Sequence, residues 1–311
     1  MELRDLRTFA TVARTLNFRR TSECLNTAQS TVSARIASLE DELGVRLFDR
    51  LGAKVVLTET GSRLLGYAQK MLDLEDEARA WVMDDTEIRG SLTVRVPESL
   101  CTHRLGGAIR AFREQFPLIK LNFITCTLDG LEKDLRLGVT DLAFVYMDAV
   151  KAADLRVEYL GSEPLILASA PDHPMARMRK VLPEAFQGVS LLLAKGDCSY
   201  RRMFEGLLSE CRVETGVGME FSSLAALEQC LIAGLGVTII PEVTVRGDLH
   251  NGSLVTLAWQ GEPLETGILM IRHKEKWLSP PLRAFMELVK VEMARSLQGT
   301  KIVLALGSAG S

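Results

Sequence analysis

Residues 59–89 carry a helical pattern that no turn signal interrupts, and its length restricts what this chain can fold into. Apolar residues recur along it at steps of three and four: Leu64, Leu65, Ala68, Met71, Leu72, Leu74, Ala78, Trp81 and Val82. At about 1.5 Å for each residue, a helix of about 30 residues extends ~45 Å. One small domain cannot bury a stripe of that length. We therefore expect a linker helix that pairs with the same helix of a second copy.

Three shorter helices and a hairpin are predicted before this segment. The first helix has apolar residues at helical spacing: Leu6, Phe9, Ala10 and Ala13. Asn17 is the expected N-cap of the second helix, and Gly44 ends the third. Residues 45–50 and 54–58 then have the pattern of two short strands. This order of elements is typical of a winged helix-turn-helix, which we place over residues 1–58.

The third helix combines an apolar stripe, with Val32 and Ile36, and a face of small polar residues. Small side chains allow close approach to a DNA groove, and Gln, Ser, Thr and Arg can bond base edges or phosphates. A solvated surface would explain any one of these residues, but the order of elements favours DNA binding. The residues expected to contact DNA are Arg19, Gln29, Ser30, Thr31, Ser33, Arg35, Arg50 and Lys54.

Composition excludes several classes of protein. With 47% hydrophobic and 25% charged residues, the chain has the profile of a globular protein. No apolar run reaches the ~20 residues that cross a bilayer, and the start lacks a secretory pattern, so we expect a cytoplasmic protein. Six scattered Cys and four His show no metal-ligand spacing, and we expect neither metal nor cofactor. Residues 1–58 have nine Lys and Arg against seven Asp and Glu, a weakly basic balance.

After Gly90 the pattern changes to strands that alternate with helices, beginning with LTVRV, LNFIT and LAFVY. Such alternation predicts an α/β domain with a mainly parallel sheet. The pattern restarts after Glu163, and the final unit, GILMI with a helix over residues 282–297, resembles the first. We therefore predict two lobes crossed by two strands. Lobe I covers 90–162 and 266–298, lobe II covers 163–265, and a disordered tail covers 299–311.

The run FATVARTLNFRRTSECLNTAQSTVSARIASLEDELGVRLFDR, followed by LTETG, closely resembles the N-terminal signature of LysR-type transcriptional regulators. FREQFP, LRLGVTDLAFV and CLIAGLGVTIIP stand where that family has comparable motifs in its effector domain, which is similar to type II periplasmic binding proteins. The stretch KGDCSYRRMFEGLLSE resembles a branch with a Gly-Cys-Ser-Tyr-Arg-like segment, although Asp197 intervenes between Gly196 and Cys198. The resemblance covers residues 1 to about 296.

The resemblance implies operator DNA, a small effector between the lobes, a homodimer or homotetramer, control of a nearby operon, and RNA polymerase as a further partner. Two departures affect the head. Thr21-Ser22 replaces a usual Ala-Ala pair, and we expect both hydroxyls to bond to carbonyls one turn earlier. Ala28-Gln29-Ser30 replaces a usual Ser-Gln-Pro opening, so Thr27 is the expected N-cap of the third helix.

The expected effector site lies where parallel strands end and helices begin. Its candidate residues are Ser99, Arg104, Thr125, Thr127, Cys198, Tyr200, Arg201 and Ser222. Backbone N–H groups at helix starts favour an anion, and Arg104 and Arg201 can pair with a carboxylate. We therefore expect a small carboxylate-bearing metabolite. Helix capping by the Ser and Thr residues, and salt bridges made by the two arginines, are the alternatives.

Other classes of function are weaker. The sequence has no G-x-S-x-G elbow, P-loop or complete G-x-G-x-x-G motif, so we expect no enzyme. A thiol-based redox sensor is the main alternative, because Cys198 stands near a helix start and two arginines that would lower its pKa. A neutral buried thiol is the simpler interpretation of that residue. A solute-binding protein would not need the winged head.

Overall fold

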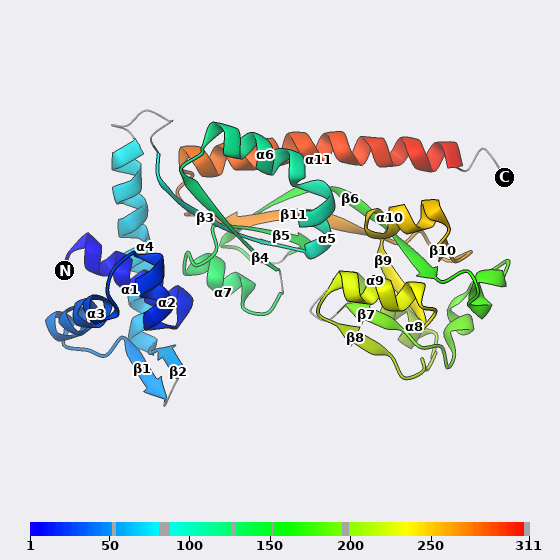
Figure 1. Cartoon of the computed structure of the whole chain (residues 1–311), viewed down its shortest axis with the longest axis horizontal. Helices are drawn as coiled ribbons and strands as arrows, with labels where there is room; N and C mark the ends of the chain where they lie inside the picture. The colour runs from blue at the N-terminus through cyan, green and yellow to red at the C-terminus, as the bar shows by residue number, and fades with distance from the viewer. Residues whose placement is uncertain (52–53, 81–87, 126–127, 151, 195–198, 308–311) are drawn as a thin grey trace.

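The computed structural model describes residues 1–51, 54–80, 88–125, 128–150, 152–194 and 199–307, and they form three parts. Figure 1 shows a helical head at one end, a single helix α4 (Glu59–Ala80) beside it, and an elongated two-lobed body. This is the predicted order of winged helix-turn-helix, linker helix and α/β effector-type domain. The predicted fold class is confirmed.

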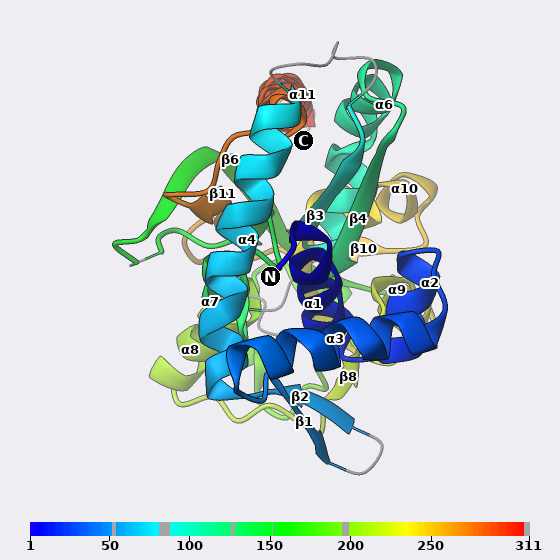
Figure 2. The same cartoon turned by 90° about the vertical axis from the view of Figure 1, so that its left-hand side faces the viewer.

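The head contains three helices and a hairpin: α1 (Leu3–Thr15), α2 (Phe18–Cys24), α3 (Gln29–Leu43), β1 (Phe48–Leu51) and β2 (Lys54–Leu57). Their apolar sides meet in one core, where the rings of Phe9 and Phe18 both contact the ring of Phe48. Figure 2 shows α3 lying across the lower end of the head, next to the hairpin. The winged helix-turn-helix is therefore complete.

Local capping fixes where the head helices begin and end. Asn17 Oδ1 accepts a hydrogen bond from the Arg20 backbone N–H at 3.0 Å, and Thr58 Oγ1 accepts one from Gly61 N–H at 2.9 Å. Gly44 adopts φ 65° at the end of α3, a conformation that glycine reaches without steric cost. The predictions for Asn17 and Gly44 are confirmed.

The prediction of Thr27 as the N-cap of α3 is wrong. The N-cap is Ala28, and no side chain caps this helix. The Thr27 backbone N–H donates to the carbonyl of Ser22 at 3.0 Å, so Thr27 closes the turn after α2 and stands one residue too early. The recognition helix thus begins with backbone N–H groups that no cap side chain occupies.

The two hydroxyls that replace Ala-Ala in α2 behave differently from each other. Ser22 Oγ donates to the carbonyl of Arg19 at 2.7 Å, as expected for back-bonding within a helix. Thr21 Oγ1 instead lies 2.7 Å from Thr15 Oγ1, across to α1, so the prediction is wrong for Thr21. A partner in the neighbouring helix satisfies this buried hydroxyl without bending α2.

Helix α4 has one buried face and one exposed apolar stripe. Leu65 and Ala68 belong to the core of the head. Tyr67, Met71 and Leu74 are 66%, 41% and 64% exposed, and their spacing of four and three puts them on one side of the helix. The predicted helix extended to residue 89; residues 81–87 lie outside the described part of the chain, and the prediction is wrong for Ile88 and Arg89, which are not helical.

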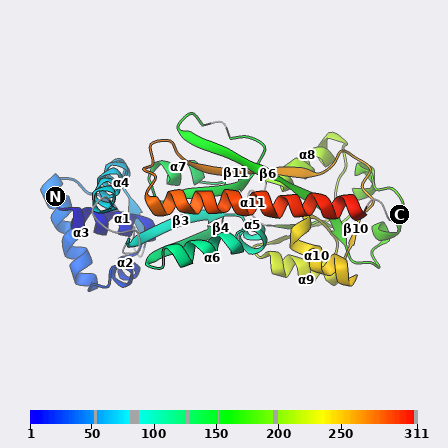
Figure 3. The ribbon, with the colours of Figure 1, turned by 90° about the horizontal axis from the view of Figure 1, so that it is seen from above.

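Lobe I is built on three parallel strands, in the order β5-β3-β4: β3 (Gly90–Val96), β4 (Ile119–Thr125) and β5 (Leu142–Tyr146). Its connecting helices are α5 (Glu98–Arg104), α6 (Gly106–Gln115) and α7 (Leu131–Arg136). Figure 3 shows α6 and α7 on opposite sides of the sheet. Helices α5 and α6 are separate elements that meet at Leu105, the C-cap of α5 and the N-cap of α6.

Lobe II contains shorter strands and three helices. The strands are β7 (Leu192–Ala194), β8 (Met219–Phe221), β9 (Val237–Pro241) and β10 (Val255–Thr256), and the helices are α8 (Ser199–Glu210), α9 (Leu224–Ile232) and α10 (Glu242–Asn251). Two 3-10 turns, at Pro174–Arg177 and Pro183–Phe186, complete it. Strands β7 and β8 pair in parallel.

Two long strands, β6 (Leu155–Ser169) and β11 (Glu265–His273), cross from one lobe to the other and pair antiparallel. In lobe I, β11 pairs antiparallel with β5, and in lobe II β6 pairs antiparallel with β9 and β10. Among the described strands, parallel pairing is therefore found between β5, β3 and β4 in lobe I and between β7 and β8 in lobe II, whereas the crossing strands pair antiparallel with all their neighbours. Strand–helix alternation fixes the direction of strands that helical crossovers join, and the described residues between β5 and β6 contain no helix.

Helix α11 (Pro280–Gly307) runs along the outside of both lobes in Figures 1 and 3. The predicted disordered tail is wrong for residues 299–307, which continue this helix, and residues 308–311 lie outside the described part. Residues such as Lys301, Leu304 and Ala305 favour helix strongly enough to outweigh Gly299 and Thr300. Among the described helices, α11 included, none has both the length and the apolar run of a bilayer crossing.

Candidate functional site

The outer face of α3 is the first candidate site. Val32, Ile36 and Leu39 are buried in the head core. Gln29 and Ser30, at the start of the helix, are exposed, and Thr31 and Ser33 are half-buried at the flanks of the exposed face. The helix therefore presents its polar residues to solvent from its first two turns, which is where a recognition helix contacts base edges.

Arg35 lies on the flank of α3 that faces α1. Its Nη1 donates to Thr8 Oγ1 at 3.3 Å, and its side chain is half-buried. This hydrogen bond directs the guanidinium along the edge of the head. A DNA contact by Arg35 would be made at the groove's edge, with phosphate, because a side chain held at the flank cannot also reach base edges.

Glu40 connects α3 to the wing, and the sequence reasoning missed it. Its Oε1 accepts hydrogen bonds from the backbone N–H groups of Leu47 and Phe48, at 2.7 and 3.1 Å. A carboxylate that accepts two backbone N–H bonds holds those amides firmly. The orientation of the wing relative to α3 is thus fixed from the last turn of the helix. Glu40 and its two partners are seven and eight residues apart, a separation that local sequence patterns do not connect.

The other expected DNA contacts lie in α2 and in the hairpin. Arg19 is exposed in α2, with Glu23 Oε1 3.5 Å from its Nε. Arg50 stands in β1 and Lys54 in β2, two strands that pair antiparallel. The side chains of Arg50 and Lys54 lie outside the described part of the structure.

The second candidate site is the junction between the lobes. Ser99, in the first turn of α5, is buried, and its Oγ lies 3.0 Å from the hydroxyl of Tyr146 at the end of β5. The ring of Tyr146 contacts the ring of Tyr200 from lobe II, with centroids 6.0 Å apart. Ser99 and Tyr200, which the sequence placed at the effector site, are therefore brought together with Tyr146, which it missed.

Glu98 also bridges the lobes. The backbone N–H of Leu224, in the first turn of α9, donates to Glu98 Oε2 at 3.4 Å. Glu98 follows β3 in lobe I, and α9 belongs to lobe II. The partial positive charge at the start of α9 thus has a carboxylate of the chain itself beside it. The two residues are 126 positions apart, so no spacing rule could have paired them.

Arg104 is not available to an effector, which corrects the prediction. It is buried, and its Nε and Nη2 donate to both carboxylate oxygens of Glu163, at 3.0 and 2.6 Å. Its Nη1 donates to Ser296 in α11. Burial raises the pKa of the Glu163 carboxyl, and the Arg104 guanidinium opposes this rise. The alternative of a salt bridge, left open for Arg104, is the one that the structure supports.

Arg201 is likewise engaged with the chain's own carboxylates. Its Nε lies 2.9 Å from Glu205 Oε1 within α8, and its Nη2 lies 2.7 Å from Glu220 Oε1 in β8. Arg201 is therefore paired within the chain, which is the salt-bridge alternative left open for it, and its pairing with an effector carboxylate stays a prediction.

The remaining expected effector residues are spread around the junction. Thr125 is exposed at the end of β4, and Ser222 is exposed just before α9. Thr127 and Cys198 lie outside the described residues. Four cysteines within the described part carry free thiols, Cys24, Cys101, Cys211 and Cys230. Burial raises the pKa of the Cys101 thiol, which makes it less reactive.

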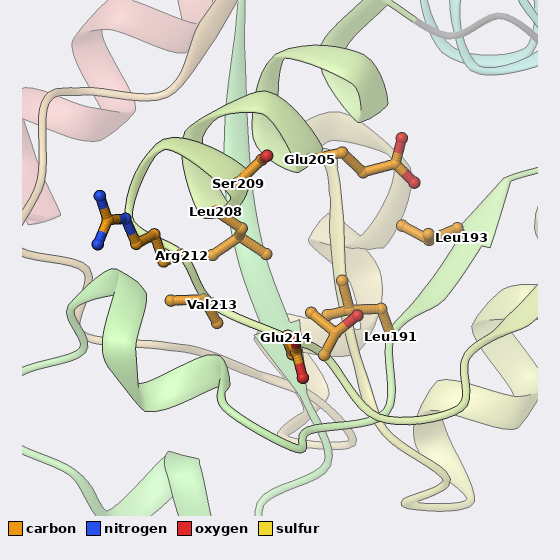
Figure 4. A pocket seen from close by; sticks show the side chains of 9 residues that line it. Leu191, Leu193, Glu205, Leu208, Ser209, Arg212, Val213 and Glu214 are labelled. Atoms are coloured by element: carbon orange, nitrogen blue, oxygen red, sulfur yellow. The ribbon is translucent and has the colours of Figure 1, made fainter.

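A pocket of about 390 Å³ lies in lobe II, between the end of α8 and β7 (Figure 4). It is lined by Leu191, Leu193, Glu205, Leu208, Ser209, Arg212, Val213, Glu214 and Thr215. In Figure 4 the side chains of Arg212 and Glu205 point to opposite sides, so its polar groups do not converge. None of the expected effector residues that the structure describes lines this pocket. Within the described residues, no group of His, Cys, Asp and Glu could hold a metal ion.

A winged head, a linker helix and a two-lobed body with a bridged junction are the parts of a ligand-responsive transcription regulator. Residues 3–62 match the family model "Bacterial regulatory helix-turn-helix protein, lysR family". Residues 85–294 match the model "LysR substrate binding domain". The chain belongs to the LysR family of transcriptional regulators.

Relatives and solved structures agree with this assignment. The HTH-type transcriptional regulator YwqM of Bacillus subtilis is 39% identical over 293 residues, which cover 93% of this chain and 99% of the relative. The RuBisCO operon transcriptional regulator of Allochromatium vinosum is 28% identical over 301 residues, which cover 95% of this chain and 97% of the relative. A full-length OxyR variant from Pseudomonas aeruginosa shares the fold, with a TM-score of 0.72 at 24% identity over 94% of each chain. The two relatives are named as regulators of transcription, and this chain is a regulator rather than an enzyme.

Proposed function

We propose that this chain binds operator DNA through α3 and the β1–β2 wing, and that it changes transcription of a nearby operon when a small molecule enters the junction between its lobes. The observation that carries the DNA-binding part is the two-sided α3, which buries Val32 and Ile36 and exposes Gln29 and Ser30. RNA polymerase is a further partner in this proposal, and the regulator acts in the cytoplasm, where its DNA target lies.

Each predicted domain has its own role in this proposal. Residues 1–58 bind DNA, residues 59–89 link and dimerise, and two lobes, 90–162 with 266–298 and 163–265, enclose the effector. The segment KGDCSYRRMFEGLLSE favours the branch of the family with a Gly-Cys-Ser-Tyr-Arg-like segment.

Replacing Gln29 with alanine is expected to weaken binding to the operator about tenfold to a hundredfold. A glutamine that makes two hydrogen bonds to the major-groove edge of one base contributes about 1–3 kcal/mol of discrimination, and about 1.4 kcal/mol corresponds to tenfold. Ser33→Ala should have the same sign and a smaller size. The measurement is fluorescence anisotropy at fixed salt, with an operator recovered by in vitro selection on the full chain and a scrambled duplex of equal length.

Two control variants separate base reading from phosphate binding. Ser38→Ala changes an exposed residue near the end of α3 and should leave both affinities unchanged. Lys54→Ala, in the wing, should weaken the operator and the scrambled duplex alike, since phosphate contacts carry no sequence information. Equal losses on both duplexes for Gln29→Ala would show that Gln29 does not read bases.

For the effector, we propose a carboxylate that takes the place of Glu98 at the start of α9. A helix start attracts anions, and here Glu98 already accepts a hydrogen bond from the Leu224 N–H. The proposal no longer depends on Arg104 or Arg201, because both are paired with glutamates. Ser222, exposed just before α9, stays a candidate contact for the effector.

Glu98→Gln is expected to tighten the binding of a small carboxylate about tenfold, because it removes an internal competitor worth about 1.4 kcal/mol. The measurement is the shift in melting temperature of the full chain with each of a panel of small mono- and dicarboxylates, and with amides and amines of matched size. Glu114→Gln, an exposed change in α6, is the control. If an amine binds the wild type, and Glu98→Gln abolishes that binding, the effector is cationic and the carboxylate proposal is wrong.

The third part of the proposal is a homodimer formed through α4. Tyr67, Met71 and Leu74 form an exposed apolar stripe, here called the α4 stripe. Residues at spacings of four and three form the seam of paired helices, where each side chain fits between those of the partner. A second copy of the same helix would cover the α4 stripe and place two α3 helices on one duplex.

A further inference from the structure

Lys276, in the loop between β11 and α11, holds its ammonium group between two carboxylates from distant parts of the chain. Its Nζ lies 3.0 Å from each carboxylate oxygen of Asp73 in α4, and 3.0 Å from Asp141 Oδ1 just before β5. The three side chains, here called the Lys276 cluster, are 10%, 17% and 13% exposed. Burial lowers the pKa of Lys276, but the two carboxylates outweigh it and hold that pKa above its usual value.

The surface around the Lys276 cluster is shaped to receive α4. Leu137 and Val139, in the loop after α7, pack against the core of the head. Gly138 between them adopts φ 66°, and a Cβ there would lie 2.2 Å from Cγ of Gln69 in α4. The linker helix is thus in close contact with lobe I over two neighbouring segments, and the Lys276 cluster is the charged part of that contact.

The cluster stands at the opposite end of the lobe I strands from the effector junction. Asp141 Oδ2 also accepts a hydrogen bond from the Thr93 N–H in β3, at 2.7 Å. Followed toward their carboxyl ends, β3 leads to Glu98 and β5 ends at Tyr146, both at the junction. Strand β5 spans about 13 Å over its length, at about 3.3 Å for each residue. Two short, rigid strands therefore separate α4 from the lobe contacts.

The crossing strand β11 reaches the same cluster from lobe II. It begins beside Pro164 of β6, passes along β5, and ends at His273. The Lys276 backbone N–H donates to the carbonyl of His273 at 3.2 Å, which closes the turn after the strand. Lys276 is thus joined by one turn to a strand that runs between the two lobes.

From this arrangement we infer that the Lys276 cluster couples the junction between the lobes to the DNA-binding head, by making α4 follow β11 and β5. Separating a buried charge from its partners is strongly unfavourable, so α4 moves with Lys276 rather than sliding past it. Coupling between two binding sites is reciprocal, so DNA bound at the head must alter the junction. The inference rests on the DNA binding proposed above.

A Lys276 cluster that only holds α4 in place would have the same structure as a cluster that couples the two sites. The two roles differ in what happens at the junction when DNA binds. If the cluster only holds α4 in place, operator DNA leaves amide exchange at the junction unchanged. If it couples the two sites, operator DNA changes exchange in residues 97–104, which follow β3, and the change disappears when the cluster is broken. Exchange of α4 itself reports whether the contact is closed.

The experiment is hydrogen exchange by mass spectrometry on the full chain, with and without the selected operator. Wild type should show a change of about threefold or more in exchange at residues 97–104 on binding operator, and none with scrambled duplex. Lys276→Met should still bind the operator, should lose that change, and should exchange about tenfold faster in α4. Lys70→Met, which removes the exposed pair of Lys70 with Glu275 on the same surface, should behave as wild type.

The charge-swapped variant Asp73→Lys with Lys276→Asp keeps one cation and two carboxylates in the cluster, and it should restore the change at residues 97–104. It also guards against Lys276→Met failing to fold. An operator effect that persists in Lys276→Met, that is absent in wild type, or that the swap does not restore would overturn the coupling. Failure of wild type to bind any selected operator would instead overturn the proposed function.

Discussion

Replacing Glu163 with glutamine is expected to lower the free energy of unfolding of the effector domain by about 3–5 kcal/mol, because an uncompensated buried charge costs about that much. The change leaves Arg104 buried with a full charge and without its carboxylate. The corresponding fall in melting temperature is on the order of 10 °C for a domain of this size. Thermal unfolding followed by circular dichroism on the full chain measures it.

Two further variants show whether the cost comes from the unpaired charge. Arg104→Met combined with Glu163→Leu removes both charges and should recover most of the stability, since apolar replacements of buried pairs are often neutral. Glu114→Gln breaks the exposed pair with Arg110 and should cost about 0.5 kcal/mol or less. If Glu163→Gln has the same melting temperature as the Glu114→Gln control, Arg104 is not held as a buried charge.

Replacing Leu74 with lysine is expected to halve the mass of the assembly in solution. Leu74 is 64% exposed in the α4 stripe, and burying a leucine contributes about 1.5–3 kcal/mol. Because each subunit of a two-fold dimer contributes its own residue 74, the loss of binding free energy occurs twice, and the dissociation constant of the dimer rises about a hundredfold or more. Sedimentation velocity at micromolar and nanomolar concentration makes the measurement, and the halved mass is expected whether wild type is a dimer or a tetramer.

Met178→Lys is the matched control for this prediction. Met178 is 41% exposed in lobe II, so the variant adds the same charge to another exposed apolar position. It should keep the wild-type mass. A Leu74→Lys protein that retains full mass at nanomolar concentration would remove α4 as the dimer contact.

Most of the fold follows from patterns within a few residues. Asn17 and Thr58 mark helix starts by accepting a hydrogen bond from a nearby backbone N–H, Gly44 marks a helix end by its positive φ, and apolar spacing identifies α1, α3 and α4. The sequence does not predict α10, because Val243, Thr244 and Val245 favour strand and only packing against neighbouring elements makes them helical. The end of α11 is missed for a related reason, since small residues near Gly299 weaken the pattern without ending the helix.

The contacts at the candidate sites could not be predicted, because they join residues far apart in the chain. Arg104 was placed at the effector site by its position after a strand, but Glu163, 59 positions later, determines its role. Asp73 and Lys276 are separated by 203 positions. Residue types indicate the class of site. They do not show which residue pairs with which, because that depends on how the fold brings distant residues together.

Helix α11 lies along both lobes in Figure 3, but its main described contacts are with α5, α6 and the crossing strand β6. Leu297 rests against Gly161 of β6 so closely that a methyl group there would not fit. Gly161 therefore acts as a spacer of zero thickness: any larger residue at this position would have to push α11 away from the strand that crosses between the lobes.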